Sequence, residues 1–465
     1  MNFGLRGWSR VGIGTARRAL TVITLLLACS VAAIHAPGHV SMDTSVQLYE
    51  AHTGLSVSWN PPFMSALMRW LGGGELATTA LVILHVVLLY GASLLVIDSL
   101  LRARERNGNT TVTIWKMLLA SAVVLNPIIA IYAGIVWKDV LFGALLAGGA
   151  ACAIAALAEQ GTPRGLYATL AVLALAAALL TRQQGIFMAP VLLLVLLADR
   201  GRRTTLRAWL LVMAAFALAV LFLQQSAGQA VRDSDSRSTS VGFRSIMIFD
   251  MMGIVAYSAR SASELAAAIT PQQLRAVRIV YQPSRIDSIA SDPVAESWLN
   301  GFTPTALRGA WWALVCQNPG AWLKHRAAAF ATLLGLSGIK HTLPVHTGVH
   351  GNTAYLQAVG LQERRSLRDL LVERVAASLF GLPLYRHAFW LTTLIVCAVA
   401  WHRCALQAPL RRTAGCIIAA CALFYVSFAP TMIASDFRYL FAAIPLIGLV
   451  ILVLAFGARE EEHAP

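Results

Sequence analysis

Isolated ionisable residues in the turns between long apolar segments are the groups in this sequence with the clearest chemistry. Asp43 follows the first apolar segment, and Lys138, Arg182 and Arg438 stand in three later turns. A carboxylate in a partly desolvated position can have a raised pKa and act as a general base. Ammonium and guanidinium groups suit phosphate oxygens. Cations that converge at one membrane face therefore predict a site for a lipid-attached phosphate.

Each of these residues also has a structural interpretation. Asp43 could cap the helix that follows it, and Lys138 could pair with its neighbour Asp139 while its ammonium reaches the headgroups. Arg182 could be a turn residue whose long side chain extends to the lipid–water interface, and Arg438 could pair with the aspartate two residues before it. Spacing alone leaves both interpretations open at each position.

Further polar residues could support such a site, and they are Tyr439, Glu50, Asn60, Asp139 and Asp250. Asp43, Gln47 and Glu50 recur at i, i+4 and i+7, which predicts one face of a surface helix. We interpret Glu50 there as an ordinary solvated position. Asn60 precedes two prolines, which predicts the start of a second surface helix that ends at the glycines 72–74.

No metal or cofactor site is predicted. His341, His346 and His350 lie close in the sequence, but Pro344 and two glycines break the helix that would align them, and no carboxylate lies among them. We interpret this segment as a mobile polar loop. The chain has no Gly-x-Ser-x-Gly, His-Glu-x-x-His or phosphate-binding P-loop motif, so neither a divalent metal nor ATP-driven transport finds support.

The chain as a whole has far too few charges for a soluble protein. Of its 465 residues, 57% are hydrophobic and 13% are charged, and the mean hydropathy is +0.66. A soluble domain carries about 25% charged residues. This composition excludes a cytosolic globular enzyme, a disordered chain and a nucleic-acid-binding protein, although the net charge is +15.

Ten apolar segments indicate how the chain is organised. A spanning helix needs roughly 20 apolar residues, and backbone groups inside lipid must be paired within their own segment, which makes these segments helices. We predict an all-α polytopic membrane protein with about ten transmembrane helices, amphipathic outer-surface helices and one long outer segment. The apolar segments are 19–35, 76–97, 117–137, 140–158, 165–181, 185–198, 208–223, 388–401, 413–434 and 439–457.

The segments divide the chain into three predicted parts. Segment 244–258 is apolar but too short to cross, and it contains Asp250, so we interpret it as a helix in the membrane interface or in a cleft. The parts are an N-terminal membrane module of about seven spans (1–223) with its first outer loop (36–75), an outer segment (224–387), and a C-terminal membrane module of about three spans (388–465).

The distribution of Arg and Lys predicts the orientation. With the N-terminus inside and ten spans, both termini are cytoplasmic, and the cations favour the inside by about four to one. The short outer loops hold Arg69, Lys138, Arg182 and Arg438. The inside segments hold Arg6, Arg10, Arg17, Arg18, Arg102, Arg104, Arg106, Lys116, Arg164, Arg200, Arg202, Arg203, Arg207, Arg403, Arg411, Arg412 and Arg459.

The outer motifs resemble those of a known group of enzymes. The first outer loop reads MDTSVQLYEA from Met42 and SWNPPF from Ser58, and the later turns read WKD from Trp137 and DFRYL from Asp436. Their order and sidedness are similar to the C-type (GT-C) integral-membrane glycosyltransferases, which include protein O-mannosyltransferases and lipid A aminoarabinose transferases. The resemblance covers about 19–223 and the last hairpin. Two departures are that Asn60 replaces the usual His, and that the long outer segment precedes the last three spans.

The resemblance implies an enzyme of the bacterial plasma (inner) membrane with its active site on the outer, periplasmic face. A sugar would pass, with inversion, from a polyprenyl-phosphate-linked donor to a hydroxyl of a glycan, lipid or protein acceptor. Asp43 would take the acceptor's proton, while Lys138, Arg182 and Arg438, with Tyr439, would bind the donor phosphate and offset the charge that develops on it. No nucleotide or cofactor would be required.

Two other functions would use the same outer cations. A transporter or flippase for lipid-linked saccharides would carry ionisable residues near the middle of its spans, where this chain is nearly uncharged. A polysaccharide ligase or polymerase also uses outer-loop arginines and a large outer segment. The transferase hypothesis requires Asp43 to meet Lys138, Arg182 and Arg438 in one pocket at the outer rim.

Overall fold

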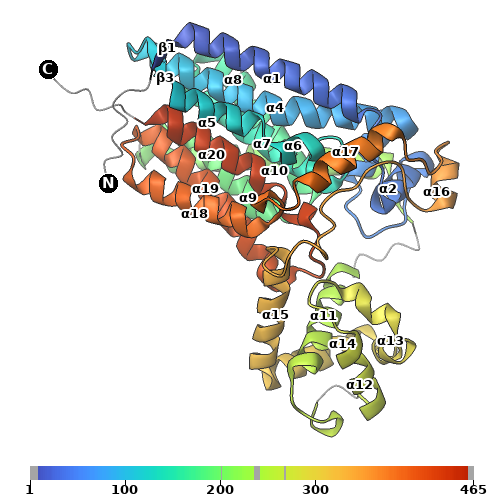
Figure 1. Ribbon diagram of the computed structural model, residues 1–465. Coiled ribbons are helices and arrows are strands. Elements are labelled where there is room, and N and C mark those ends of the chain that lie inside the picture. The colour runs from blue at the N-terminus through green and yellow to red at the C-terminus, as the bar shows by residue number, and fades with distance from the viewer. Residues whose placement is uncertain (1–8, 200–201, 235–240, 266–268, 459–465) are drawn as a thin grey trace.

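A bundle of long apolar helices forms most of the molecule (Figure 1). The computed structural model describes residues 9–199, 202–234, 241–265 and 269–458, so Arg6, Arg200 and Arg459 of the predicted inner cations lie outside it. The predicted all-α polytopic membrane fold is confirmed. Eight helical segments are long and apolar enough to cross a membrane: α1 (Ile13–His35), α4 (Gly74–Arg106), α5 with α6 (Ile114–Val124 and Pro127–Tyr132), α7 (Lys138–Ala158), α8 (Gly161–Thr181), α10 (Arg202–Ala230), α19 (Ala408–Thr431), and η5 with α20 (Phe437–Leu440 and Ala443–Gly457).

The two shortest predicted spans are helices that lie within the bundle. Helix α9 (Gly185–Leu193) continues as the 3₁₀ turn η1 (Leu194–Leu197) and packs against α8 and α19, and α18 (His387–Arg403) packs against α19 and α20. At about 1.5 Å per residue they reach about 20 and 26 Å, less than the roughly 30 Å of a hydrocarbon core. Among the described residues, eight of the ten predicted spans therefore reach full spanning length, and the other two are shorter helices.

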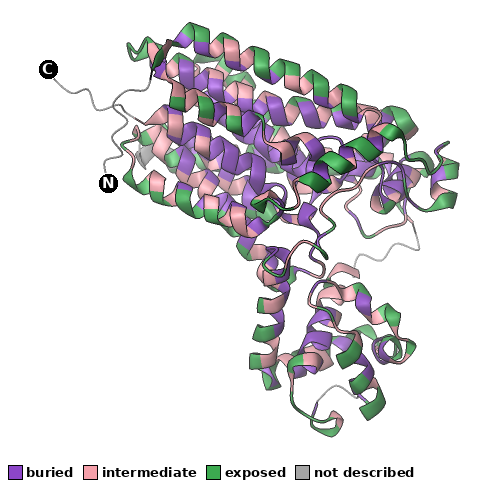
Figure 2. Cartoon of the chain, in the orientation of Figure 1, coloured by how far each residue is buried: buried purple, intermediate pink, exposed green. Residues whose placement is uncertain are grey.

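Helix α7 lies at the centre of the bundle, between α4, α8 and α20. Small residues allow this close packing: a Cβ on Gly148 would lie 2.9 Å from the Leu88 side chain, and one on Gly149 would lie 2.8 Å from Leu175. Close approach of backbones at small residues is the usual means by which helices pack in lipid. The first two residues of α7, Lys138 and Asp139, are consequently attached to the most enclosed helix of the protein (Figure 2).

The two ends of the bundle differ in what they carry. At one end, β1 (Arg10–Gly12) pairs antiparallel with β3 (Thr111–Thr113), and Arg104 Nη1 donates to the carbonyl of Phe456 at 3.2 Å. The described chain therefore begins and finishes at this end. The opposite end carries α2 (Met42–Thr53), and we call it the outer end after the predicted topology (Figure 1). The cytoplasmic location of both termini stays a prediction.

Two short helices lie on the outer end, as the sequence predicted for the first outer loop. Helix α2 is capped by Ser41, whose side chain accepts from the Thr44 amide at 3.5 Å. The interpretation of Asp43 as a helix cap is therefore wrong. Helix α3 (Phe63–Trp70) begins after Pro62 and packs against α2 and α10. The strands β2 (Leu55–Ser56) and β4 (Arg232–Asp233) pair beside it.

A separate lobe of short helices lies below the bundle in Figure 1. This outer lobe, residues 241–333, has its own apolar core and consists of α11 (Val241–Tyr257), η2 (Ala262–Glu264), α12 (Pro271–Val280), η3 (Ile286–Ser291), α13 (Pro293–Asn300), α14 (Pro304–Gln317) and α15 (Pro319–Leu333). Helix α11 packs against α12, α14 and α15. Segment 244–258 was interpreted as a helix in the membrane interface or in a cleft, and the structure favours an enclosed position, because the apolar face of α11 lies at the centre of the lobe.

The rest of the predicted outer segment belongs to other parts of the molecule. Helix α10 continues to Ala230, so the predicted boundary at 223 falls inside a helix. Helices α16 (Thr353–Ala358) and α17 (Leu367–Ser378) lie over the outer end of the bundle, and η4 (Pro383–Tyr385) leads into α18. Two different structures, the lobe and a cover over the outer end, therefore occupy one polar stretch of sequence.

A buried carboxylate fixes the outer lobe. Asp250 accepts from the indole Nε1 atoms of Trp311 at 2.9 Å and Trp322 at 2.8 Å, and from Arg326 Nε at 2.6 Å. Arg326 also donates to the carbonyl of Met432 at 2.7 Å, at the end of α19. Asp250 thus joins three helices of the lobe, and Arg326 ties them to the last outer turn.

We expect Asp250→Ala to destabilise the lobe. The variant leaves the buried guanidinium of Arg326 and two indole donors without their acceptor, which costs about 3–5 kcal/mol. Thermal unfolding of the purified protein in detergent, with limited proteolysis, should show a lower Tm and faster cleavage within 241–333. Glu296→Ala, at an exposed lobe position, is the matched control. A wild-type Tm for Asp250→Ala would contradict this account.

Candidate active site

The four residues singled out in the sequence meet at the outer end of the bundle. Asp43 lies in the first turn of α2, Lys138 begins α7, Arg182 ends α8, and Arg438 lies in η5. Arg438 Nη2 is 2.7 Å from Asp43 Oδ2. We call the set Asp43, Lys138, Asp139, Arg182, Asp436 and Arg438 the outer charge cluster.

Asp139 is the buried centre of the outer charge cluster, with 1% of its surface exposed. It binds Arg182 through Oδ1, while its Oδ2 lies 3.8 Å from Arg438 Nε. That separation is too long for a hydrogen bond, and neither of these two atoms has another hydrogen-bond partner among the described residues. Buried polar atoms are normally satisfied, so these two atoms of opposite charge are an exception at the centre of the cluster.

Lys138 does not take Asp139 as its hydrogen-bond partner in the structure. Its ammonium donates to Asn60 Oδ1 and lies 4.9 Å from the centre of the Trp59 ring. Both partners come from the loop before α3. The interpretation of Lys138 and Asp139 as a local pair is therefore wrong, and Asn60 acquires a role as a ligand of Lys138.

Arg182 is fixed inside the protein. Besides Asp139, it donates to the carbonyl of Tyr439 at 3.0 Å and to Gln184 Oε1 at 3.1 Å. Its guanidinium also lies 5.3 Å from the Phe428 ring and 5.1 Å from the Tyr439 ring. Because it is buried, the interpretation of Arg182 as a side chain that extends to the interface is wrong. Arg182 orients Asp139 and the backbone of Tyr439.

Arg438 connects the buried part of the outer charge cluster to its exposed part. It lies 4.7 Å from the centre of the Trp137 ring and 3.3 Å from Asp436 Oδ2, so the predicted pair with the aspartate two residues earlier is present. The Asp43 side chain is 44% exposed. Among these carboxylates Asp43 therefore faces the solvent and Asp139 lies beneath it.

The charges of the cluster set the protonation of its carboxylates. Burial raises the pKa of Asp43, but the positive charges of Arg438 and Lys138 outweigh it, so the pKa lies below its ordinary value. Burial raises the pKa of Asp436, and the charges of Arg438 and Arg285 only partly oppose it. Asp43 is consequently an anion at neutral pH, paired with Arg438.

Glu50 holds the loop that carries Asn60, and the prediction that Glu50 is solvated is wrong. Its carboxylate is fully buried and accepts from the amides of Val57 at 2.9 Å and Ser58 at 2.8 Å, and from Ser65 Oγ at 2.7 Å. These bonds hold the loop that presents Asn60 to Lys138. Gln47, on the same face of α2, is also buried.

The other two sequence candidates divide between the two parts of the molecule. Tyr439 joins the cluster through its carbonyl and through its ring, which lies 5.3 Å from the Arg438 guanidinium. Asp250 lies instead in the core of the outer lobe, as described above. Among the residues that the structure describes, no group of three or more His, Cys, Asp or Glu is placed to hold a metal ion.

Two residues at the site were not found from the sequence. His346 donates from Nε2 to the carbonyl of Val40 at 2.8 Å and lies over Trp137 with ring centres 6.0 Å apart, so the supposed mobile loop packs against the site. Arg285, from the outer lobe, lies 3.8 Å from Asp436 Oδ1. His346 stands in the histidine pattern that we interpreted as a mobile loop, and Arg285 stands in no pattern; both reach the site through tertiary packing.

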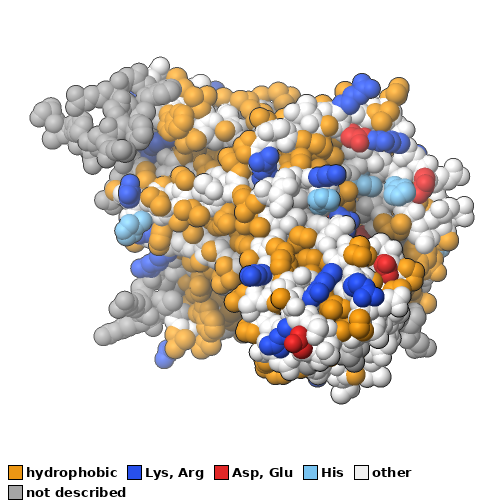
Figure 3. All heavy atoms as spheres, turned by 60° about the horizontal axis from the view of Figure 1, so that its bottom comes forward, with side chains coloured by type: hydrophobic (Ala, Val, Ile, Leu, Met, Phe, Trp, Pro, Cys, Tyr) orange, Lys and Arg blue, Asp and Glu red, His pale blue; other side chains and the backbone are white. Residues whose placement is uncertain are grey.

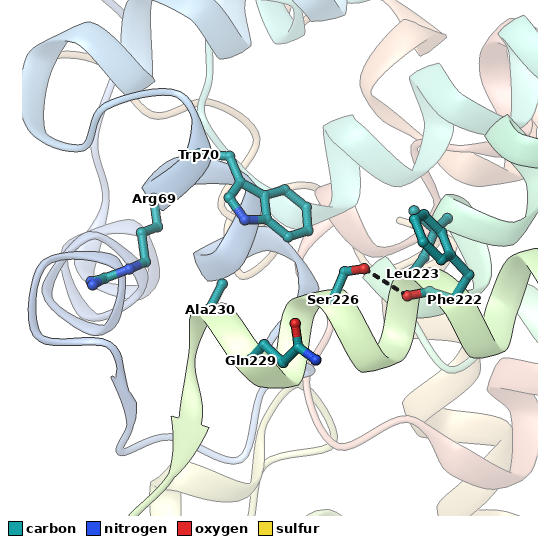
Figure 4. Close-up of a pocket in the computed structure, with 7 residues that line it drawn as sticks. All are labelled: Arg69, Trp70, Phe222, Leu223, Ser226, Gln229 and Ala230. Carbon is teal, nitrogen blue, oxygen red and sulfur yellow. Dashed lines mark hydrogen bonds between the residues drawn. The ribbon is translucent and has the colours of Figure 1, made fainter.

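Two hollows lie near the outer charge cluster. One, of about 590 Å³, lies between the end of α3 and the last turns of α10, with Trp70 turned toward Ser226 (Figure 4). The other, of about 490 Å³, is lined by His346 and by the segment before and within α17. The first adjoins a helix with a largely exposed apolar surface, and the second is lined mainly by polar and charged side chains.

No family model and no curated protein matches this chain. Among solved structures it is similar to ArnT from Cupriavidus metallidurans in the apo state (TM-score 0.32, 14% identity, 95% of this chain and 78% of that chain covered). It is also similar to the same protein bound to undecaprenyl phosphate (TM-score 0.33, 14% identity, 94% and 77% covered). ArnT is a C-type glycosyltransferase, a lipid A aminoarabinose transferase, of the group that the outer motifs resemble. At these TM-scores the likeness assigns no role to any residue.

We expect Glu50→Ala to lower the stability of the outer end. The variant removes the acceptor of two backbone amides and one hydroxyl, at about 1–3 kcal/mol for each buried group left unpaired. Glu50→Gln is the matched control, because its amide oxygen can still accept from Val57 and Ser58. Thermal unfolding in detergent should rank wild type above Glu50→Gln and Glu50→Gln above Glu50→Ala. An equal Tm for all three would show that the loop is held by other contacts.

Proposed function

We propose that this protein is an inverting glycosyltransferase. It transfers a sugar from a polyprenyl-phosphate-linked donor to an acceptor hydroxyl at the outer face of a bacterial inner membrane, with both termini in the cytoplasm. The observation that carries the proposal is the pairing of Asp43, the solvent-facing carboxylate, with Arg438 at 2.7 Å, beside Lys138 and the Arg182–Asp139 pair. The outer motifs that resemble C-type glycosyltransferases support it.

The donor phosphate would bind at Lys138 and Arg438. Each of these cations faces a partner that an anionic phosphodiester can replace: the neutral amide of Asn60 for Lys138, and the exposed carboxylate of Asp43 for Arg438. Arg438 Nε, which has no hydrogen-bond partner among the described residues, would gain one. Arg182 and the Tyr439 backbone would act through Asp139, by keeping it and Arg438 in place.

Donor binding would also release the base. In the structure Asp43 is bound to Arg438, and the charge of Arg438 contributes to the lowered pKa of Asp43. A phosphate that takes over Arg438 neutralises this charge, so the pKa of Asp43 rises toward the value suited to accepting a proton. The acceptor would then be deprotonated only when the donor is in place.

The proposed reaction is one displacement at the anomeric carbon. The acceptor O–H gives its proton to Asp43 as its oxygen forms the new bond to the sugar. The bond from the anomeric carbon to the phosphate oxygen breaks on the opposite face, and the electron pair leaves with the polyprenyl phosphate. Lys138 and Arg438 stabilise the charge that grows on this leaving group, which is the effect that usually contributes most to catalysis.

The apolar chain of the donor has a surface to lie on. Helix α3 follows Asn60 at the cluster and ends at the groove lined by Trp70, Phe222 and Leu223 (Figure 4). Its eight residues separate the two sites by about 12 Å. The groove adjoins α10, whose central residues are mostly exposed where lipid would surround them. A chain in the outer leaflet would therefore reach the cluster along α3.

We expect Asp43→Asn to lose transfer while keeping affinity for the donor phosphate. A general base contributes about 10²–10⁴-fold to a rate, so transfer should fall at least about a hundredfold. The assay uses purified protein in detergent, the lipid-linked sugar fraction from cells that lack the protein as donor, and their envelope extract as acceptor. Undecaprenyl phosphate binding should stay within about threefold of wild type.

The matched control for this variant is Asp287→Asn, an exposed carboxylate of the outer lobe. It should transfer like wild type. Near-normal transfer by Asp43→Asn would remove Asp43 from the role of base. Transfer in detergent by the wild type, where no translocation occurs, also separates an enzyme from a flippase.

We expect Lys138→Gln to weaken phosphate binding and to change the pH dependence. A hydrogen bond to a charged group contributes about 1.5–3 kcal/mol, so affinity for undecaprenyl phosphate should fall about 10- to 100-fold. The charge of Lys138 lowers the pKa of Asp43, and Asp43 must be deprotonated to accept a proton. Without Lys138 the acid limb of the rate profile should move to higher pH. Lys324→Gln, at an exposed lobe position, should change neither quantity.

A further inference from the structure

A second polar groove lies on the outer end of the molecule. It has a volume of about 490 Å³, and the polar residues that line it include His346, His350, Glu363, Arg364, Arg365 and Glu373. Figure 3 shows acidic, basic and histidine side chains interspersed at the right-hand end of the molecule, whereas hydrophobic side chains cover much of the bundle. The groove therefore opens to the aqueous side and not to lipid.

His346 places this groove next to the outer charge cluster. It lines the groove, and its ring is 6.0 Å from that of Trp137, which in turn lies 4.7 Å from the Arg438 guanidinium. The same loop is attached to α2, because the amide of Asn352 donates to Ser45 Oγ at 3.2 Å. One layer of side chains thus separates the groove from the Asp43–Arg438 pair.

The orientation of His346 leaves one ring nitrogen available. Nε2 contacts the carbonyl of Val40, which can only accept, so the proton of the neutral ring lies on Nε2. Nδ1 is then an acceptor, and it has no hydrogen-bond partner among the described residues. Burial lowers the pKa of His346, opposed in part by the bond to Val40, so the ring is neutral near pH 7.

The charges of the groove balance one another. Arg365 pairs with Glu373, His350 Nδ1 is 3.0 Å from Glu363 Oε1, and Arg364 pairs with Glu75 of α4 at 3.0 Å. Paired carboxylates and guanidinium groups supply acceptors and donors for hydroxyl groups without a net charge that would select an anion. The outer charge cluster, in contrast, has cations whose partners a phosphate can displace.

We propose that this groove is the acceptor subsite, that it takes a neutral, hydroxyl-rich carbohydrate, and that His346 Nδ1 accepts a hydrogen bond from a hydroxyl group of the acceptor other than the reacting one. The inference rests on the proposed transferase function. The donor would approach from the lipid side at α3 and α10, and the acceptor from the aqueous side over α17. The reacting hydroxyl gives its proton to Asp43, while the hydrogen bond from the other hydroxyl to His346 orients the acceptor and so fixes the direction of attack.

The test uses the purified full-length protein in detergent with the same lipid-linked sugar fraction as donor. Two acceptor probes are assayed separately: the water-soluble envelope glycans and the organic-phase lipids from cells that lack the protein. The variants are Arg365→Gln and Glu373→Gln, which change an exposed pair, and His346→Gln. Arg275→Gln, at an exposed lobe position, is the matched control. Undecaprenyl phosphate affinity is measured for every variant.

We expect transfer to the glycan probe and not to the lipid probe. Arg365→Gln and Glu373→Gln should raise the KM for the glycan about tenfold, the effect of one charged hydrogen bond of about 1.5 kcal/mol, with kcat within twofold. His346→Gln should lower kcat at least tenfold because it disturbs the direction of attack. Affinity for undecaprenyl phosphate should not change in any of the three.

Three results would overturn the inference without contradicting the proposed function. One is an unchanged KM for the glycan in both Arg365→Gln and Glu373→Gln, with Asp43→Asn still inactive, which would place the acceptor elsewhere. Another is transfer to the lipid probe alone, which would exclude a free glycan as the acceptor class. The third is a loss of undecaprenyl phosphate affinity in Arg365→Gln and Glu373→Gln, which would contradict a separate acceptor subsite. If Asp43→Asn transfers like wild type, the proposed function is contradicted, and the inference that rests on it is contradicted as well.

Discussion

The buried carboxylate of Asp139 is the interaction on which the arrangement of the outer end depends. A charge this deeply buried is tolerated only when it is paired, because the loss of hydration costs several kcal/mol. Its partner Arg182 comes from the end of α8, and Arg438 approaches from η5, so one carboxylate fixes how α7, α8 and η5 meet. Among the described spans α7 is also the most buried, so Asp139 is attached to the helix with the most enclosed surface.

The outer charge cluster combines a rigid part with an exchangeable one. Arg182 and Asp139 are buried and bound to each other and to backbone, whereas Asp43 is 44% exposed and holds Arg438 through a single contact at 2.7 Å. Only the Asp43 side of this ion pair is exposed, so the carboxylate regains water when a ligand takes its place at Arg438. The same contact keeps Arg438 oriented while no ligand is bound. The buried pair of Arg182 and Asp139 therefore stabilises the cluster, and the contact between Asp43 and Arg438 is the one that a ligand can replace.

The sequence predicted the helices and the convergence of the cations, but not their partners. Long apolar segments must be helical in lipid, and alternating passes bring alternate turns to one end, so Lys138, Arg182 and Arg438 had to share a membrane face. Partner choice depends on side-chain direction: Lys138 and Asp139 are adjacent on α7 and point about 100° apart, so they do not face each other. Each binds a residue distant in sequence, Asn60 and Arg182 respectively. The burial of Glu50 was hidden for the same reason, because the loop that covers it is a tertiary contact.

The hydropathy pattern did not predict the outer lobe, because its helices are short and each is only partly apolar. The lobe nevertheless affects the position of Arg438. The turn before Arg438 is held by the lobe, through Ile286 N to the carbonyl of Ile433 at 2.9 Å and Arg326 to Met432 at 2.7 Å. It is held from the other side by Phe437 N, which donates to the carbonyl of Thr342 at 2.6 Å. Residues 341–350 continue from that bond to the groove at His346. A shift of the lobe would therefore move the turn of Arg438 against Asp139, which is fixed on α7, and would disturb the segment that lines the groove.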